Sequence, residues 1–152
     1  MNRLLYNNLT TKKVDIFESN NFSIKFQSNW RQLRKTGNKT ISDFINLKNY
    51  IGILQISSFQ HSDENYVFDL KESLSEIEQN GHKAEIKNIS QYKSAVYALN
   101  YEDEKLYQFR FEFGHKNKRL FITLTFDNTN DKVIAENYNE IVKILNTIKF
   151  KE

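Results

Sequence analysis

The sequence has no cysteine and no proline among its 152 residues, and it has only four glycines. Without cysteine, the chain can form neither a disulfide bond nor a thiolate metal site, and it offers no thiol nucleophile. The glycines do not fall in the spacings GxGxxG or GxxxxGK[ST], which excludes the usual phosphate-binding loops. No segment approaches the roughly 18 apolar residues of a membrane span, and the N-terminus lacks the apolar core of a secretory signal. These absences predict a cytoplasmic protein with no membrane span and no cofactor.

The net charge of +3 is modest, but the charges are unevenly placed along the chain. Residues 1–60 hold nine Lys/Arg against three Asp/Glu, a balance of +6, whereas residues 61–112 hold six against eleven, a balance of −5. The remaining residues hold seven against five, which restores the total. Such asymmetry can steer a charged partner toward one face. Local drift in the charge of solvated surfaces is the simpler alternative.

Residues 92–126 carry the strongest structural signal, because apolar and polar residues alternate there with a period of two. This pattern predicts three β-strands joined by charged turns at residues 101–105 and 114–118. The middle strand has a ladder of aromatic residues at alternate positions, Tyr107, Phe109, Phe111 and Phe113. We predict that this ladder forms the face of the sheet on which a helix packs.

The rest of the chain predicts further strands and two helices. Alternation indicates strands at 14–17, 22–26, 41–47 and 82–89, and the nearly unbroken apolar run 51–59 predicts a central strand covered on both faces. Apolar spacings of three and four predict a helix at 62–80 and a second one beginning at Asn128 or Asn130. No repeat or linker divides the chain, which predicts a single domain over 1–152 with a polar lead-in at 1–13. The predicted fold is α+β, an antiparallel sheet flanked by helices.

This order of elements resembles the PsbP-like superfamily, which includes the PsbP subunit of photosystem II, a yeast Ran-binding nucleotide-release factor and small bacterial proteins. The resemblance covers residues 14–150 and is carried by the stretches FSIKFQSNW, ISDFINL, IGILQISSF, LYQFRFEFGHKNKRLFITLTF and EIVKILNTIKF. It implies an α/β/α sandwich and a history of binding to larger proteins. It transfers no functional residue, because the superfamily has no shared site motif.

The residues that could carry chemistry do not form a recognisable site. His61, His82 and His115 are not in HxH, HExxH or HxxxH spacing, so we predict no metal site. The acidic turn at residues 102–104 (Glu102, Asp103, Glu104) lacks the alternating ligand spacing of a calcium loop.

Catalysis by paired carboxylates would need two acids at inward positions in a cleft. Asp43 and Glu112 are the acids in predicted strands, and we interpret both as lying on solvent-exposed faces. The motif GxSxG is absent, so we predict that the chain is not an enzyme. A weak hydrolase would need a cleft that holds a carboxylate and two of the histidines.

A basic cluster beside the single tryptophan is the candidate partner-binding patch, formed by Trp30, Arg31, Arg34, Lys35 and Lys39. Arginine and tryptophan are favoured anchors of protein interfaces. The short basic run and the absence of an RNA-binding signature argue against a nucleic-acid partner. The simpler alternative is that Trp30 anchors a corner of the core and that a solvated loop follows it.

Together these observations predict a non-catalytic protein-binding module whose partner is another protein, as an adaptor, chaperone or toxin-neutralising protein. The alternative is a carrier of a small molecule or lipid in an apolar cavity between the sheet and a helix.

Overall fold

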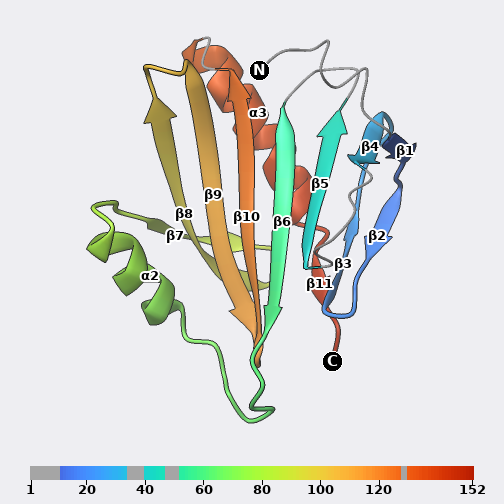
Figure 1. The fold of residues 1–152 in the computed structure, drawn as a ribbon, viewed down its shortest axis with the longest axis vertical. Helices are drawn as coiled ribbons and strands as arrows, with labels where there is room; N and C mark the ends of the chain where they lie inside the picture. The colour runs from blue at the N-terminus through green and yellow to red at the C-terminus, as the bar shows by residue number, and fades with distance from the viewer. Residues whose placement is uncertain (1–10, 34–39, 47–51, 128–129) are drawn as a thin grey trace.

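The computed structural model describes residues 11–33, 40–46, 52–127 and 130–152, and over these ranges the chain is mostly antiparallel β-sheet. Eight strands form a large sheet in the order β1-β4-β5-β6-β10-β9-β8-β7, and three strands form a small sheet in the order β11-β3-β2 (Figure 1). The strands of the large sheet are β1 (Thr11–Lys13), β4 (Trp30–Leu33), β5 (Ile41–Asn46), β6 (Ile53–Gln60), β7 (Glu85–Ile89), β8 (Tyr92–Tyr101), β9 (Leu106–His115) and β10 (Lys118–Asp127). The small sheet and the two helices are β2 (Ile16–Glu18), β3 (Phe22–Lys25), β11 (Lys149–Phe150), α2 (Leu70–Gln79) and α3 (Asp131–Leu145).

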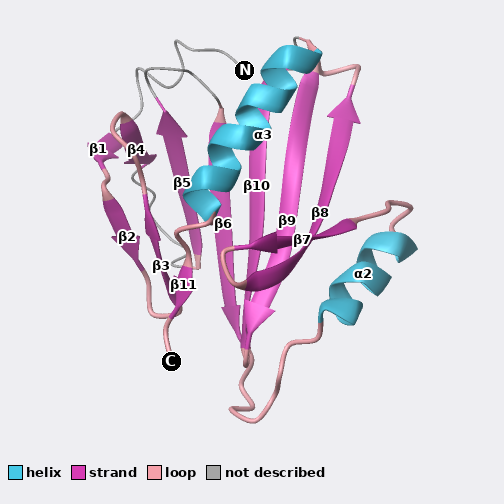
Figure 2. Cartoon of the chain, turned by 180° about the vertical axis from the view of Figure 1, so that it is seen from behind, coloured by secondary structure: helices cyan, strands magenta, loops and turns pink. Residues whose placement is uncertain are grey.

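The core lies on one face of the large sheet, beneath α3 and the small sheet (Figure 2). Phe109 and Phe111 on β9 contact the Tyr138 ring of α3, with ring centroids 5.1 and 6.2 Å apart. Ile141 and Leu145 follow on the same stripe of α3 and are fully buried. The prediction that the aromatic ladder is the helix-docking face is therefore confirmed.

The predicted α/β/α sandwich, with helices flanking the sheet, is wrong. The described ranges form eleven strands and two helices of 10 and 15 residues, and only α3 lies across the sheet. The other helix, α2, packs against β8 and β9 at one end of the opposite face. A helix of 10 residues is about 15 Å long. It is too short to cover a sheet whose longest strands have 10 residues at about 3.3 Å each.

The central strand β6 is covered on one face, not on both as the apolar run 51–59 predicted. Leu54 and Ile56 point toward α3 and are buried, whereas Gln55 and Ser57 on the other face are half-buried. Phe59 continues the second face with 49% of its surface exposed. The polar residues within IGILQISSF therefore mark an accessible face of the sheet.

The helix predicted at 62–80 begins eight residues later, at Leu70. Asp69 is its N-cap, and its carboxylate accepts a hydrogen bond from the Lys71 amide at 3.0 Å. Residues 62–69 form a loop, in which Val67 is 69% exposed. The predicted end at residue 80 is confirmed, since Asn80 is the C-cap and Gly81 after it has the left-handed conformation (φ +84°) that often closes a helix.

Strand β7 crosses the α3 side of the sheet below the helix, which closes that end of the core (Figure 2). The turn after β7 is fastened to the end of α3, because the Ser90 amide donates to Asn146 Oδ1 at 2.7 Å. Ile89 at the end of β7 is buried, whereas Ile86 in the same strand is 56% exposed.

The small sheet joins an early strand of the chain to the last one. Strand β11 pairs antiparallel with β3, with Phe150 opposite Phe22, and both side chains are buried. Of the predicted lead-in at 1–13, residues 1–10 lie outside the described ranges, and Thr11–Lys13 form β1, which pairs with β4. Neither α2 nor α3, the helices of the described ranges, is long and apolar enough to cross a membrane.

Candidate functional site

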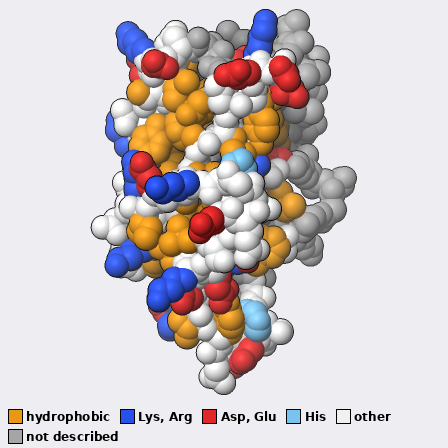
Figure 3. All heavy atoms as spheres, turned by 90° about the vertical axis from the view of Figure 1, so that its left-hand side faces the viewer, with side chains coloured by type: hydrophobic (Ala, Val, Ile, Leu, Met, Phe, Trp, Pro, Cys, Tyr) orange, Lys and Arg blue, Asp and Glu red, His pale blue; other side chains and the backbone are white. Residues whose placement is uncertain are grey.

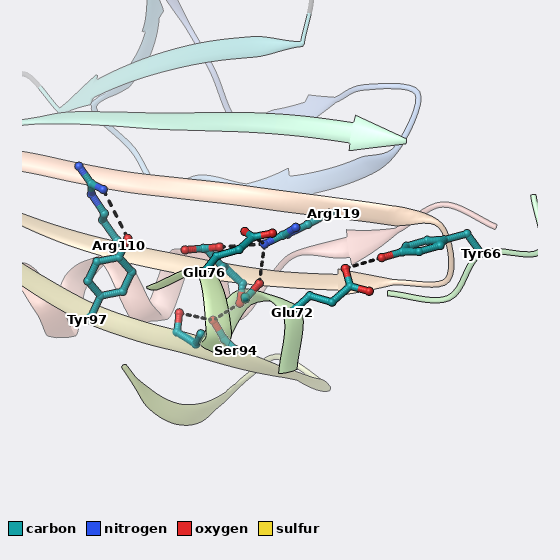
Figure 4. Close-up of polar contacts among 10 residues, drawn as sticks. Tyr66, Glu72, Glu76, Ser94, Tyr97, Arg110 and Arg119 are labelled. Carbon is teal, nitrogen blue, oxygen red and sulfur yellow. Dashed lines mark hydrogen bonds and ion pairs between the residues drawn. The ribbon is translucent and has the colours of Figure 1, made fainter. Parts of the chain in front are cut away.

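We call the face of the large sheet that lies opposite α3 the open face. A row of polar side chains crosses five of its strands, because the register places Asp43, Gln55, Thr123, Arg110 and Tyr97 opposite one another on β5, β6, β10, β9 and β8. Gln55 Nε2 donates to Asp43 Oδ1 at 3.0 Å. Arg110 donates to the Tyr97 hydroxyl at 3.4 Å, a contact drawn in Figure 4. The row is thus linked by hydrogen bonds at both ends.

Two adjoining cavities lie on the open face beside α2. The first, which we call the aromatic pocket, has a volume of about 520 Å³ and is lined by Phe59, Gln60, His61, Tyr66, Phe68, Glu76, Asn117, Lys118, Arg119 and Phe121. The second, of about 340 Å³, lies over the polar row and includes Gln55, Tyr97 and Arg110. Glu76 and Phe121 line both cavities, so the two cavities form one groove along the sheet beside α2.

Arg119 on β10 joins the sheet to α2 at the middle of this groove. Its Nη2 donates to Ser73 Oγ at 2.8 Å, to Glu76 Oε2 at 3.0 Å and to Glu112 Oε1 at 3.1 Å (Figure 4). Ser73 and Glu76 belong to α2, and Glu112 belongs to β9. One guanidinium group therefore holds α2 against the open face.

The same guanidinium lies between two aromatic rings. Its Cζ atom is 4.4 Å from the centre of the Phe121 ring and 5.1 Å from the centre of the Phe68 ring. Aromatic faces carry negative electrostatic potential, so a cation held between two of them is stabilised. Phe121 also contacts the exposed Phe59 edge to face, at 5.4 Å between ring centroids. The wall of the aromatic pocket is therefore built around the positively charged guanidinium group of Arg119.

Glu112 is the buried acid of the site, with 8% of its side chain exposed. Burial raises the pKa of its carboxyl above the usual value, and the neighbouring Arg119 opposes that rise only in part. Glu76, on the same guanidinium, adds to the rise because a second negative charge disfavours ionisation of Glu112. The charge of the site therefore depends on the ionisation state of Glu112.

The loop that closes the aromatic pocket is fastened to the turn between β9 and β10. The His61 amide donates to the Asn117 carbonyl at 2.7 Å, and Asn117 Nδ2 donates back to the His61 carbonyl at 3.1 Å. The Phe68 amide donates to the Lys116 carbonyl at 2.7 Å. The loop is thus held at both ends, which keeps Phe68 over the sheet.

Gly114 provides the room for Phe68. A Cβ atom at this position would lie 2.7 Å from the Phe68 ring and 2.5 Å from the Lys118 carbonyl oxygen, both closer than real Cβ atoms approach. Gly114 pairs with Arg119 across the hairpin. The glycine in the turn sequence GHKNK therefore lets an aromatic ring pack directly on the strand backbone.

Of the predicted basic patch, the structure describes Trp30 and Arg31. Trp30 is fully buried and packs against Phe26, with ring centroids 5.4 Å apart, so it serves the core and cannot contact a partner. Arg31 is half-buried and donates to Thr11 Oγ1 at 2.7 Å, which joins β4 to β1. Arg34, Lys35 and Lys39 lie outside the described residues.

The three histidines lie at separate places. His61 stacks on Tyr66 at 4.1 Å and lines the aromatic pocket, whereas His82 stacks on Tyr97 at 5.7 Å. His115 contacts the Glu152 carboxylate at 3.1 Å. Within the part of the chain that the structure describes, no group of three or more His, Asp or Glu residues could hold a metal ion.

The interpretation of Asp43 and Glu112 as solvent-exposed acids is wrong. Asp43 and Glu112 are both buried, and each carboxylate accepts a hydrogen bond from a neighbouring side chain. The turn at 102–104 is exposed, as expected for the tip of a hairpin. Sequence reasoning missed Arg119, Phe68 and Phe59. For Arg119 the available signal was its place with Glu112 on the polar face of the hairpin, opposite the aromatic ladder. No local pattern marked Phe59 or Phe68.

Comparison with known proteins supplies the fold but no family. No protein-family model matches the chain, and no curated protein matches it. The crystal structure of a protein from Bacteroides thetaiotaomicron VPI-5482 is similar, with a TM-score of 0.67 at 16% sequence identity over 93% of this chain. The match covers 50% of that protein, so this chain spans about half its length. At this identity the likeness shows the fold alone, and the resemblance to the PsbP-like superfamily stays a prediction.

Proposed function

We propose that the chain is a non-catalytic protein-binding module, and that the open face receives a segment of another protein. The observation that carries this proposal is the groove of the two adjoining cavities, on a face that α2 covers at one end. Phe59 leaves 49% of its surface exposed at the edge of this groove. Exposed apolar surface rimmed by polar residues is typical of interaction sites.

The polar groups of the groove support binding over catalysis. Arg119 is engaged with Glu76 and Glu112, and the Tyr66 hydroxyl donates to the Glu72 carboxylate. A catalytic constellation needs groups that converge on the position of a reacting atom. Here the groups pair with one another, which suits a rigid surface for recognition.

Site-specific photo-crosslinking tests the proposal. A benzoylphenylalanine in place of Phe59 keeps an aromatic ring at the groove, and the same residue in place of Lys143 places the probe on the exposed side of α3. We expect a discrete cross-linked protein from position 59, formed in the cells that produce the protein, and none from position 143. Equal cross-linking from both positions, or none from position 59, would count against the open face as a docking site.

A carrier of a small apolar molecule is the second candidate function. The aromatic pocket, at about 520 Å³, has the size of small-molecule sites and lies between the sheet and α2. Native mass spectrometry of the protein purified from its own cells should then show a bound small molecule. Replacement of Phe121 by tryptophan should remove it by filling the pocket. A single mass equal to that of the chain without a ligand would rule out the carrier function.

A further inference from the structure

The charged groups around the aromatic pocket are mostly acidic. Glu72 accepts a hydrogen bond from the Tyr66 hydroxyl, and Glu76 and Glu112 share Arg119 (Figure 4). Glu76 and Arg119 line the pocket itself, Glu112 lies beside them in the adjoining cavity, and Glu72 lies next to the lining residue Tyr66. Lys118, although it lines the pocket, has its ammonium bonded to the carbonyl oxygen of Lys151.

The segment that forms the outer wall of the pocket extends this negative charge. Residues 61–80, the loop and α2, contain six Asp/Glu and one Lys, a balance of −5. Figure 3, which faces the side of the molecule with α2, shows hydrophobic side chains at the surface between charged ones. An anionic partner would be repelled here, and a cationic one would be attracted.

The aromatic lining of the pocket also favours a cationic partner. Phe59, Tyr66, Phe68 and Phe121 line the pocket, and aromatic faces attract cations within about 6 Å of the ring centre. Arg119 already shows this geometry inside the protein, between Phe68 and Phe121. Phe59 and Tyr66 add two further rings to the lining, and the Tyr66 hydroxyl is bonded to the Glu72 carboxylate.

We propose that the aromatic pocket binds a lysine or arginine side chain presented by a basic segment of the partner protein. This inference rests on the proposed function and specifies the chemistry of the partner. The apolar stem of the long basic side chain packs on the rings, and its charged end lies near Glu72 and Glu76.

Two matched peptides test whether the pocket prefers a cationic or an anionic side chain. One alternates leucine with lysine and the other leucine with glutamate, both acetylated and amidated, and each is titrated into the labelled protein while amide NMR signals are followed. We expect the lysine peptide to bind about ten-fold more tightly. Its binding should shift the amides of His61 and Phe68 and weaken as salt is added.

Variants on α2 provide the matched control. Glu72→Lys reverses a charge at the pocket and should reduce binding of the lysine peptide several-fold. Glu78→Lys makes the same change on the exposed surface of the helix away from the aromatic pocket and should leave binding close to that of the unmodified protein. Phe59→Ala should weaken binding by removing a ring.

Equal or tighter binding of the glutamate peptide would overturn the inference, as would binding of neither peptide. An equal loss of lysine-peptide binding in Glu72→Lys and Glu78→Lys would also overturn it. A concentration-dependent dimer whose interface protects His61 and Phe68 would also overturn it, by showing that a second copy occupies the pocket. A cross-link from position 59 to a different protein would still support the proposed function, whereas a cross-link between two copies of the chain would not.

Discussion

Glu112 illustrates how a single residue can acquire an altered acidity from its surroundings. Its carboxylate is buried between the open face and α2, and it shares one guanidinium group with Glu76. Removal from water disfavours the charged form more than Arg119 favours it, so the pKa of Glu112 is raised. The pH dependence of stability should therefore reveal this residue.

We expect Glu112→Gln to flatten the fall in stability that the unmodified protein shows above about pH 4.3, the usual pKa of glutamate in an unfolded chain. Because the folded-state pKa is raised, the contribution of Glu112 is fully present below that pH and is lost as pH rises through the folded pKa. Urea unfolding between pH 4 and 7 measures the difference. Glu78→Gln, at an exposed position of α2, is the control. Parallel curves for Glu112→Gln and the unmodified protein would contradict the prediction.

Arg119→Met should destabilise the protein by about 2–3 kcal/mol, because it leaves the buried Glu112 carboxylate without its cation. Urea unfolding at pH 7 measures this change. The double variant Arg119→Met/Glu112→Gln should recover part of the loss, since the uncompensated charge is gone. Strictly additive effects would mean that the two side chains do not interact.

At the scale of elements, α2 and the loop before it form a unit that docks on the hairpin of β9 and β10. Gly114→Ala should destabilise the protein by about 1–3 kcal/mol, because the new methyl group would overlap the Phe68 ring and the Lys118 carbonyl. Hydrogen exchange at the His61 and Phe68 amides should become faster, since both donate to the hairpin turn. In a Phe68→Ala background, Gly114→Ala should destabilise the protein less, because the ring that the new methyl group overlaps is gone. Unchanged exchange at these two amides would show that Gly114 does not position the loop.

The elements that the sequence predicts well are those with a long, regular pattern. Strands β8, β9 and β10 match the predicted stretch 92–126 because each has 10 residues of alternating character. The start of α2 was misplaced because Val67 lies three residues before Leu70 and continues the helical spacing. The Asp69 cap and its extended backbone end that spacing in the structure. Strand β11 was missed because two residues are too few to show a period.

The site could not be predicted, because its burial depends on elements that are distant in sequence. Glu112 and Arg119 occupy outward positions of their strands, where charged residues usually face water. They are covered because α2, some forty residues earlier in the chain, brings Ser73 and Glu76 over them. A local pattern contains no information about which segment will cover a given face.

For the whole molecule, the two faces of the large sheet should differ sharply in their contribution to stability. Phe111 lies fully buried under α3, whereas Phe59 lies at the edge of the groove with 49% of its surface exposed. Phe111→Ala should cost about 3–5 kcal/mol, since it leaves a cavity in a packed core. Phe59→Ala should cost less than about 1 kcal/mol. Similar losses for the two variants, measured by urea unfolding, would mean that the open face is a second core.

The pairing of β3 with β11 also constrains the order in which the molecule can assemble. Phe22 and Phe150 are separated by most of the described chain, yet each completes the environment of the other. During synthesis β3 cannot pair with β11 until residues more than a hundred positions later have been made. Contacts of such long sequence separation are slow to form. The large hairpins can form first, and closure of the small sheet over the core should be among the last and slowest events of folding.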